Sequence, residues 1–151
     1  MDYTAILNHM APCGLSCEKC FAHIDGHIRK YAVKLQDRLG NFDVYAQRFQ
    51  VLVGDPVFTR YPQFKEMLSY LASANCQGCR KENCKLFRNC GVRSCSKEKK
   101  LDYCFQCAEF PCEKTNFDEH LYKRWVLLNE RIREVGIHTY YAETSGEPRY
   151  K

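Results

Sequence analysis

The distribution of cysteine constrains this chain more than any other feature of its sequence. Eleven of the 151 residues are cysteines, in two blocks separated by 55 residues that contain none. The first block is Cys13, Cys17 and Cys20, and the second is Cys76, Cys79, Cys84, Cys90, Cys95, Cys104, Cys107 and Cys112. Cys76 with Cys79, and Cys104 with Cys107, leave two residues between thiols, which lets both sulfurs reach one ion from a tight turn. The spacing therefore predicts metal ligation, with all eleven cysteines as candidate ligands.

Composition indicates that these thiols are reduced. The N-terminus has no basic segment followed by an apolar run, and no stretch reaches the roughly 18 apolar residues of a membrane helix. We therefore expect a cytoplasmic protein with no membrane segment, where clustered cysteines bind metal more often than they form disulfides. The odd cysteine count also disfavours a disulfide framework. With 45% hydrophobic and 27% charged residues, the chain is expected to form a single globular domain over residues 1–151.

The formal charge of +5 depends on what the thiols hold. A four-thiolate zinc centre carries a charge of −2, so two such centres would lower the net charge to +1. Basic residues accompany the second block: Arg80, Lys81, Lys85, Arg88, Arg93, Lys97, Lys99 and Lys100. These basic residues alternate with the cysteines and with acidic residues. We therefore interpret them as counter-charges beside anionic metal centres and as part of the ordinary solvent-exposed surface. This interpretation is favoured over a nucleic-acid surface.

Helical periodicity predicts a helical core over residues 27–74. One helix should span residues 27–39, with Gly40 after its end and Asn41 as the N-cap of a second helix that ends before Gly54. These two helices are expected to pack as a hairpin, and a third should begin near Pro62. The apolar faces that should form the core are Ile28, Tyr31, Ala32, Leu35 and Leu39; Phe42, Tyr45, Ala46, Phe49, Leu52 and Val53; and Phe64, Met67, Leu68 and Leu71.

The cysteine-rich segment 76–112 shows no sustained period, so we expect an irregular segment that metal organises. Helix should resume over residues 117–135, from a capping box between Asn116 and Glu119 to a stop at Gly136. The apolar seam of this helix is Leu121, Trp125, Leu128, Ile132 and Val135. We interpret the seam as core, with a homodimer through this helix as the alternative. The tail from Tyr140 should wrap the surface.

These elements predict a mainly α fold: a small domain of about four helices with a metal-organised, irregular cysteine-rich segment. Zinc in four-thiolate sites is the expected metal. One partition joins Cys76, Cys79, Cys84 and Cys90 in one site and Cys95, Cys104, Cys107 and Cys112 in another. The first block then needs a fourth ligand, for which His23 and His27 are nearest in sequence. A partition that completes the first block with a cysteine of the second is equally consistent with the spacing.

Two other functions remain open at this point. A [4Fe–4S] cluster would make the protein a redox or electron-transfer protein, and a metal-ordered surface could bind a protein or a nucleic acid. The sequence names no partner. No motif assembles an active site, so nothing in the sequence calls for an enzyme.

Several motifs together resemble a known family. They are APCGLSCEKC at 11–20, CQGCR at 76–80, CGVRSC at 90–95, CFQCAEFPCEK at 104–114, NERIREVG at 129–136 and PRY at 148–150. This order resembles the prokaryotic proteins of unknown function grouped as DUF3795, which are described as zinc- or metal-binding. The resemblance implies a fold and a metal but no activity. It has no counterpart for Cys84, and the ten matched cysteines do not divide by four, so a histidine, a shared thiolate or spare thiols must enter.

Overall fold

A computed structural model describes residues 1–151, and it is mainly helical. It contains two isolated β-bridges and no strand. The elements are α1 (Tyr3–His9), α2 (His27–Leu39), α3 (Phe42–Leu52), η1 (Pro56–Arg60), α4 (Tyr61–Ala72), α5 (Val92–Glu98), η2 (Cys104–Gln106), η3 (Glu113–Thr115), α6 (Glu119–Val135) and α7 (Ile137–Thr144), where η marks a 3-10 helix. The seven α-helices correct the expectation of about four. The additional helices α1, α5 and α7 have only seven or eight residues, too few for a periodic pattern to stand out.

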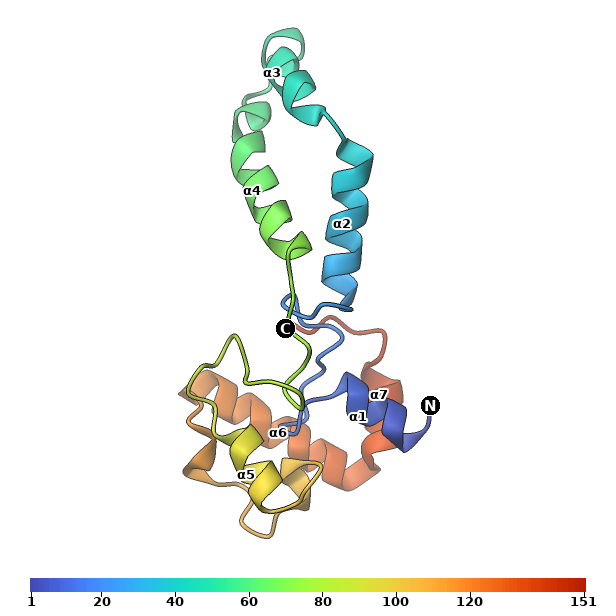
Figure 1. The fold of residues 1–151 in the computed structure, drawn as a ribbon, viewed down its shortest axis with the longest axis vertical. Coiled ribbons are helices and arrows are strands. Elements are labelled where there is room, and N and C mark those ends of the chain that lie inside the picture. Colours follow the sequence, from blue (N-terminus) through green and yellow to red (C-terminus); the bar gives the residue numbers. More distant parts are fainter.

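The molecule has two parts, which Figure 1 shows as a wide lower part and a narrow projection. We call residues 27–72 the arm and the remaining residues the base. In the arm, α2 lies along α4, and α3 packs against η1 at the far end. The predicted hairpin between the first two helices is therefore wrong. An aromatic contact explains the difference, because the ring of Phe49 lies 5.4 Å from that of Phe58 and draws α3 towards η1.

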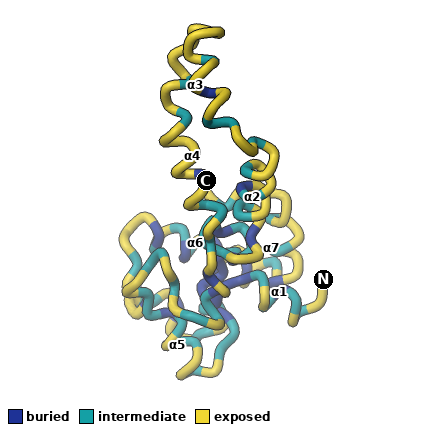
Figure 2. The backbone as a smooth tube through the Cα atoms, turned by 45° about the horizontal axis from the view of Figure 1, so that its top comes forward, coloured by how far each residue is buried: buried dark blue, intermediate teal, exposed yellow.

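The hydrophobic core lies in the base, which corrects the prediction of a helical core over residues 27–74. The main cluster of buried apolar residues includes no residue of the arm. Within the arm only Ala32, Ala46 and Leu68 are buried, whereas Leu35 is 42% exposed and Met67 60% exposed. Figure 2 shows most of the arm as exposed. The physical reason is the single layer of the arm, since two antiparallel helices cover each other only along one line.

Helix α6 carries the predicted apolar seam, and its burial confirms that the seam is core. Trp125 is 1% exposed and Ile132 0% exposed, and Trp125 meets Phe110 edge-on at 4.8 Å between ring centroids. The seam is covered by other residues of the same chain. A homodimer through this helix stays a prediction. The predicted capping box is wrong: the N-cap is Asp118, whose carboxylate accepts a hydrogen bond from the Leu121 N–H at 3.0 Å.

The tail brings the C-terminus to the junction of arm and base (Figure 1). It is helical as far as Thr144, where the sequence predicted only a surface wrap. The Arg149 guanidinium then donates to the Ser16 carbonyl, and the Tyr150 hydroxyl accepts from the Phe21 N–H at 3.2 Å. The tail thus holds the loop that carries the first three cysteines. None of the helices combines the length and the apolar character needed to cross a membrane.

Candidate metal centre

All eleven cysteines are free thiols, buried or half-buried, and all lie in the base. They line two separate cavities. The seven-cysteine cavity is lined by Cys13, Cys17, Cys20, Cys76, Cys79, Cys84 and Cys90. The four-cysteine cavity is lined by Cys95, Cys104, Cys107 and Cys112. The second group is one of the sets that the sequence suggested, whereas the first joins the two blocks of the chain.

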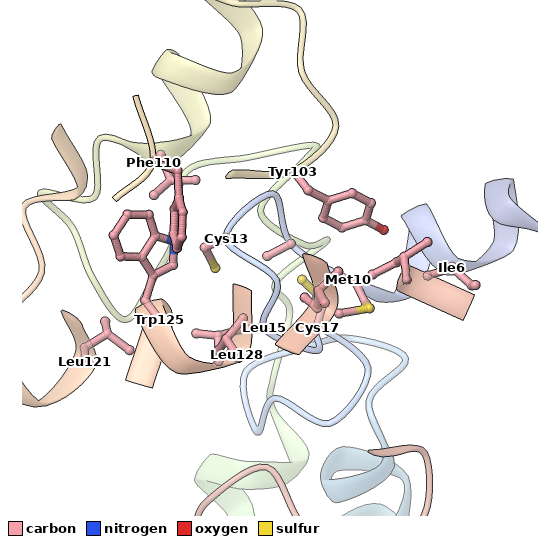
Figure 3. Close-up of a cluster of buried hydrophobic side chains, with 14 residues drawn as sticks. Ile6, Met10, Cys13, Leu15, Cys17, Tyr103, Phe110, Leu121, Trp125 and Leu128 are labelled. Atoms are coloured by element: carbon pink, nitrogen blue, oxygen red, sulfur yellow. The ribbon is translucent and has the colours of Figure 1, made fainter. Parts of the chain in front are cut away.

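Backbone hydrogen bonds shape the loop that carries the first three cysteines. The Cys17 N–H donates to the His9 carbonyl at 2.7 Å, and the Cys20 N–H donates to the Cys17 carbonyl at 2.9 Å. Gly14 has a φ of +86°, and a Cβ there would lie 2.5 Å from Leu128 Cδ1 on α6. Glycine is needed at this position on both grounds. Figure 3 shows the Cys13 and Cys17 side chains within the cluster of buried apolar side chains that this loop joins.

Further hydrogen bonds join this loop to the rest of the base. The Cys76 N–H donates to the Ala22 carbonyl at 2.8 Å, and the Ile24 N–H donates back to the Cys76 carbonyl at 2.9 Å. The Cys104 N–H donates to the Pro12 carbonyl at 2.9 Å. The amide of the buried Asn129 side chain donates to the Cys13 carbonyl, also at 2.9 Å. The bonds at Cys76 bring the second block to the cavity of the first, and the bond from Cys104 to Pro12 holds the two cavities side by side.

Three cysteines of the seven-cysteine cavity are close neighbours. The thiol of Cys79 is within hydrogen-bonding reach of both Cys17 and Cys84. The hydrogen bond from Cys79 lowers the pKa of Cys17 to about 7 and that of Cys84 to about 5, and it raises the pKa of Cys79 itself. Cys84, which had no counterpart in the family resemblance, therefore lies beside cysteines that did.

Of the two candidate histidines, His23 lines the seven-cysteine cavity and His27 lines neither cavity. Burial lowers the pKa of His23, which favours the neutral ring. Its Nδ1 accepts a hydrogen bond from the Asp25 N–H at 3.2 Å, which assigns the ring proton to Nε2. At Gly78, with a φ of +98°, a Cβ would lie 3.6 Å from His23 Nε2 and 3.9 Å from the Cys17 sulfur. The imidazole and the Cys17 sulfur thus both lie next to Gly78 in the wall of this cavity.

The four-cysteine cavity is built from short elements around Trp125 of α6. Cys95 lies on α5 and Cys104 on η2, and Trp125 lines the same cavity. Burial raises the pKa of Cys104 to about 12, and the neighbouring indole of Trp125 opposes that rise. The indole Nε1 is nevertheless buried without a hydrogen-bond partner in the protein. On the other side the Lys99 ammonium donates to the Cys107 sulfur at 3.4 Å.

Two further residues lie beside the thiols, although the sequence analysis did not place either of them in the site. Arg149 lines the seven-cysteine cavity from the far end of the chain. Burial works to lower its pKa, but the facing Cys20 sulfur, with smaller contributions from Tyr150, Cys13 and Cys17, raises it. Trp125, read from the sequence as a core residue, is the second. Only the fold places either side chain beside sulfur, since Arg149 follows Cys20 by 129 residues and Trp125 follows Cys104 by 21.

The structure contains no group of three or more His, Cys, Asp or Glu side chains arranged to hold a metal ion. The thiols therefore stand around shared cavities without a closed ligand geometry. Their chemistry still fits a thiophilic metal. The buried Trp125 N–H lacks the acceptor that a metal-bound Cys104 thiolate would supply, and Lys99 already donates to the Cys107 sulfur.

Fold and site together define a mainly helical, cysteine-rich protein with a projecting helical arm. Comparison with known families identifies it further. The sequence profile of the family described as "Protein of unknown function (DUF3795)" matches residues 9–117, a span that includes both cysteine blocks and the arm. The chain therefore belongs to this family, as the motifs predicted. Neither the curated proteins nor the solved structures yield a match.

Proposed function

We propose that this protein is a metal-binding protein whose eleven cysteines hold structural zinc in the base. The observation that carries the proposal is the gathering of free thiols from both cysteine blocks around two cavities. In a reducing compartment such as the cytosol, metal binding is the commonest role of clustered thiols. Zinc suits closed sites of four thiolates and contributes free energy of folding directly.

The four-cysteine cavity would hold one zinc ion through Cys95, Cys104, Cys107 and Cys112. The number of thiols equals the coordination number of a structural zinc site. Such a centre carries a charge of −2, and the Lys99 ammonium at 3.4 Å from the Cys107 sulfur would offset part of it. The indole N–H of Trp125 would gain a thiolate acceptor. The polar groups around this cavity are those that a thiolate centre needs.

The seven-cysteine cavity would hold two zinc ions that share one thiolate. Two separate four-ligand ions need eight donors, and one bridging sulfur reduces the number to seven. Cys79 is the candidate bridge, because it is a neighbour of both Cys17 and Cys84 in this cavity. This scheme uses every cysteine of the cavity, including Cys84.

In this scheme His23 supports the ligands and does not join them. Its Nδ1 accepts from the Asp25 N–H, so the Nε2 that faces the cavity carries the ring proton. A ring in this state donates a hydrogen bond to a thiolate, whereas ligation through Nε2 would need the opposite tautomer. The alternative gives eight donors, with His23 as a ligand and no shared sulfur. The two schemes predict different results for substitution of His23.

The decisive measurement is the metal content of protein purified without oxygen. We expect a colourless protein with about three zinc ions per chain. Iron with matching inorganic sulfide, together with absorbance near roughly 400 nm, would instead establish a [4Fe–4S] redox protein. A folded protein with neither metal would reject the proposal altogether.

Single substitutions then test the assignment of each cavity. Cys107→Ser should remove about one zinc ion, and Cys79→Ser up to about two, because the shared sulfur serves both ions. His23→Gln should leave the zinc content unchanged. Ser94→Ala, at an exposed position of α5 one residue from Cys95, is the control and should also leave it unchanged. Loss of one zinc ion in His23→Gln would reject the shared-thiolate scheme and favour the histidine ligand.

A further inference from the structure

A cavity larger than either of the two cysteine cavities holds no cysteine. It lies between α6, α7 with the tail, and residues 10–19, and its volume is about 570 Å³. Small-molecule sites in proteins typically have volumes of roughly 300–1,000 Å³. We call it the α6–α7 cleft. Neither the metal proposal nor the family match assigns it a role.

The walls of the cleft are strongly cationic. Five basic side chains line it: Lys19, Lys123, Arg124, Arg149 and Lys151. Only two carboxylates, Glu18 and Glu147, lie among them. Glu18 already accepts from the Tyr141 hydroxyl at 2.7 Å and pairs with His9 at 2.9 Å, and Glu147 pairs with Lys151. The cleft therefore carries an excess of positive charge that its own carboxylates do not neutralise.

Two of these cations are free enough to meet a ligand. The side chain of Lys123 is 70% exposed and that of Lys151 is 54% exposed. Each has one carboxylate partner four residues away on its own segment, Glu119 and Glu147 respectively. Exposed pairs of this kind contribute little to stability, so a ligand anion can compete for both ammonium groups. Arg124 and Arg149 differ, because they donate to backbone carbonyls and hold the wall in place.

The cleft also has an apolar part and an unused hydroxyl. Leu127 of α6 lines the cleft and is 68% exposed, although the same helix buries its other apolar face in the core. The hydroxyl of Ser16 is buried and has no hydrogen-bond partner in the protein. An apolar surface beside cations and a spare hydrogen-bonding group is the usual composition of a small-molecule site.

We propose that the α6–α7 cleft binds a small organic anion, with its phosphate or carboxylate group at Lys123 and Lys151 and its apolar part over Leu127. Charge-assisted hydrogen bonds from the ammonium groups would supply most of the recognition of the anionic group. The proposal does not depend on metal in the cysteine cavities, because none of the groups that it uses is a thiol.

Phenyl phosphate is a suitable probe, since it joins an apolar ring to a dianion. Calorimetric titration of the protein of residues 1–151, as purified, should give saturable binding at one site. The double variant Lys123→Ala with Lys151→Ala should bind about tenfold more weakly or less. The control Lys30→Ala with Lys34→Ala removes the same charge from exposed positions of the arm and should stay within about twofold of the parent.

Leu127→Asp supplies an independent variant, because it places a carboxylate on an exposed position of the apolar wall. It should abolish binding while leaving thermal unfolding unchanged. The absence of saturable binding to the parent protein would overturn the proposal. Equal weakening in the cleft and arm double variants would overturn it as well, since that result would reduce the effect to net charge.

Discussion

The base and the arm are stabilised in different ways, although both consist mainly of helices. The base packs α6 against a cysteine-bearing loop, so that Trp125 and Ile132 are almost fully buried. The arm pairs α2 with α4 in a single layer and buries only three residues. The difference teaches that helical content says little about where the stability lies, since burial depends on a second layer to pack against.

Neither part has an extensive core. Only 25 of the 151 residues are buried, and four of these are cysteines of the seven-cysteine cavity. In a chain of this size a small core leaves little stability after conformational entropy is subtracted. The base can add metal ligation to its packing, whereas the arm contains no cysteine. The following predictions test this contrast, from the largest expected effect to the smallest.

Metal removal should affect the base most. Chelation under reducing conditions should unfold residues 76–112, because each structural site contributes on the order of 10 kcal/mol or more. The signal of Trp125 in near-ultraviolet circular dichroism should disappear, and amide exchange should accelerate first in the base. Unchanged spectra after complete metal loss would show that packing alone holds this part.

Truncation of the central aromatic residue should be the next largest effect. Trp125→Ala should lower the free energy of unfolding by about 3–5 kcal/mol, because it leaves a cavity in the core of the base. Tyr45→Ala in the arm is the matched control; its side chain is 51% exposed, so its cost should be below about 1 kcal/mol. Denaturant unfolding measures both, and similar losses would contradict the contrast between the two parts.

Two glycines with positive φ provide a finer comparison. Gly14→Ala should cost about 2–4 kcal/mol, because the left-handed backbone is strained and the new methyl group would meet Leu128. Gly40 in the arm also has a positive φ, but a Cβ there meets nothing within 4 Å. Gly40→Ala should therefore cost only about 1 kcal/mol. Thermal unfolding of both variants separates the packing effect from the backbone effect.

Replacing the arm should have the smallest effect on the base. The arm begins and ends at one place, since the Arg29 guanidinium donates to the Ala72 carbonyl at 3.1 Å. A short flexible linker in place of residues 27–72 should leave metal content and the Trp125 signal unchanged. The main expected loss is the contact of Tyr70 with Phe21, whose rings lie 6.1 Å apart. A base that lost its metal in this variant would have to depend on the arm.

Local signals predicted the long helices well. The extents of α2 and α3 and the start of α4 were all predicted, because Gly40 and Pro62 act on the backbone within one turn; Asn41 is the N-cap residue of α3, although its side chain makes no capping hydrogen bond. The exposure of the arm was not predicted. An apolar stripe at helical spacing indicates which face of a helix can pack against a neighbour. It does not indicate how much of that face a neighbouring element will cover.

The sequence by itself determined the family, the two cysteine blocks and the longer helices, because motifs, cysteine spacing and helical periodicity all depend on residues close together in the chain. Only the tertiary structure decided that seven thiols share one cavity and four another. It also decided that His23 and Arg149 line the seven-cysteine cavity and that most side chains of the arm are exposed to solvent. These arrangements depend on hydrogen bonds such as that from Asn129 to the Cys13 carbonyl, which joins residues 116 positions apart. Local spacing carries no information at that range, because loops of many lengths can close at similar entropic cost.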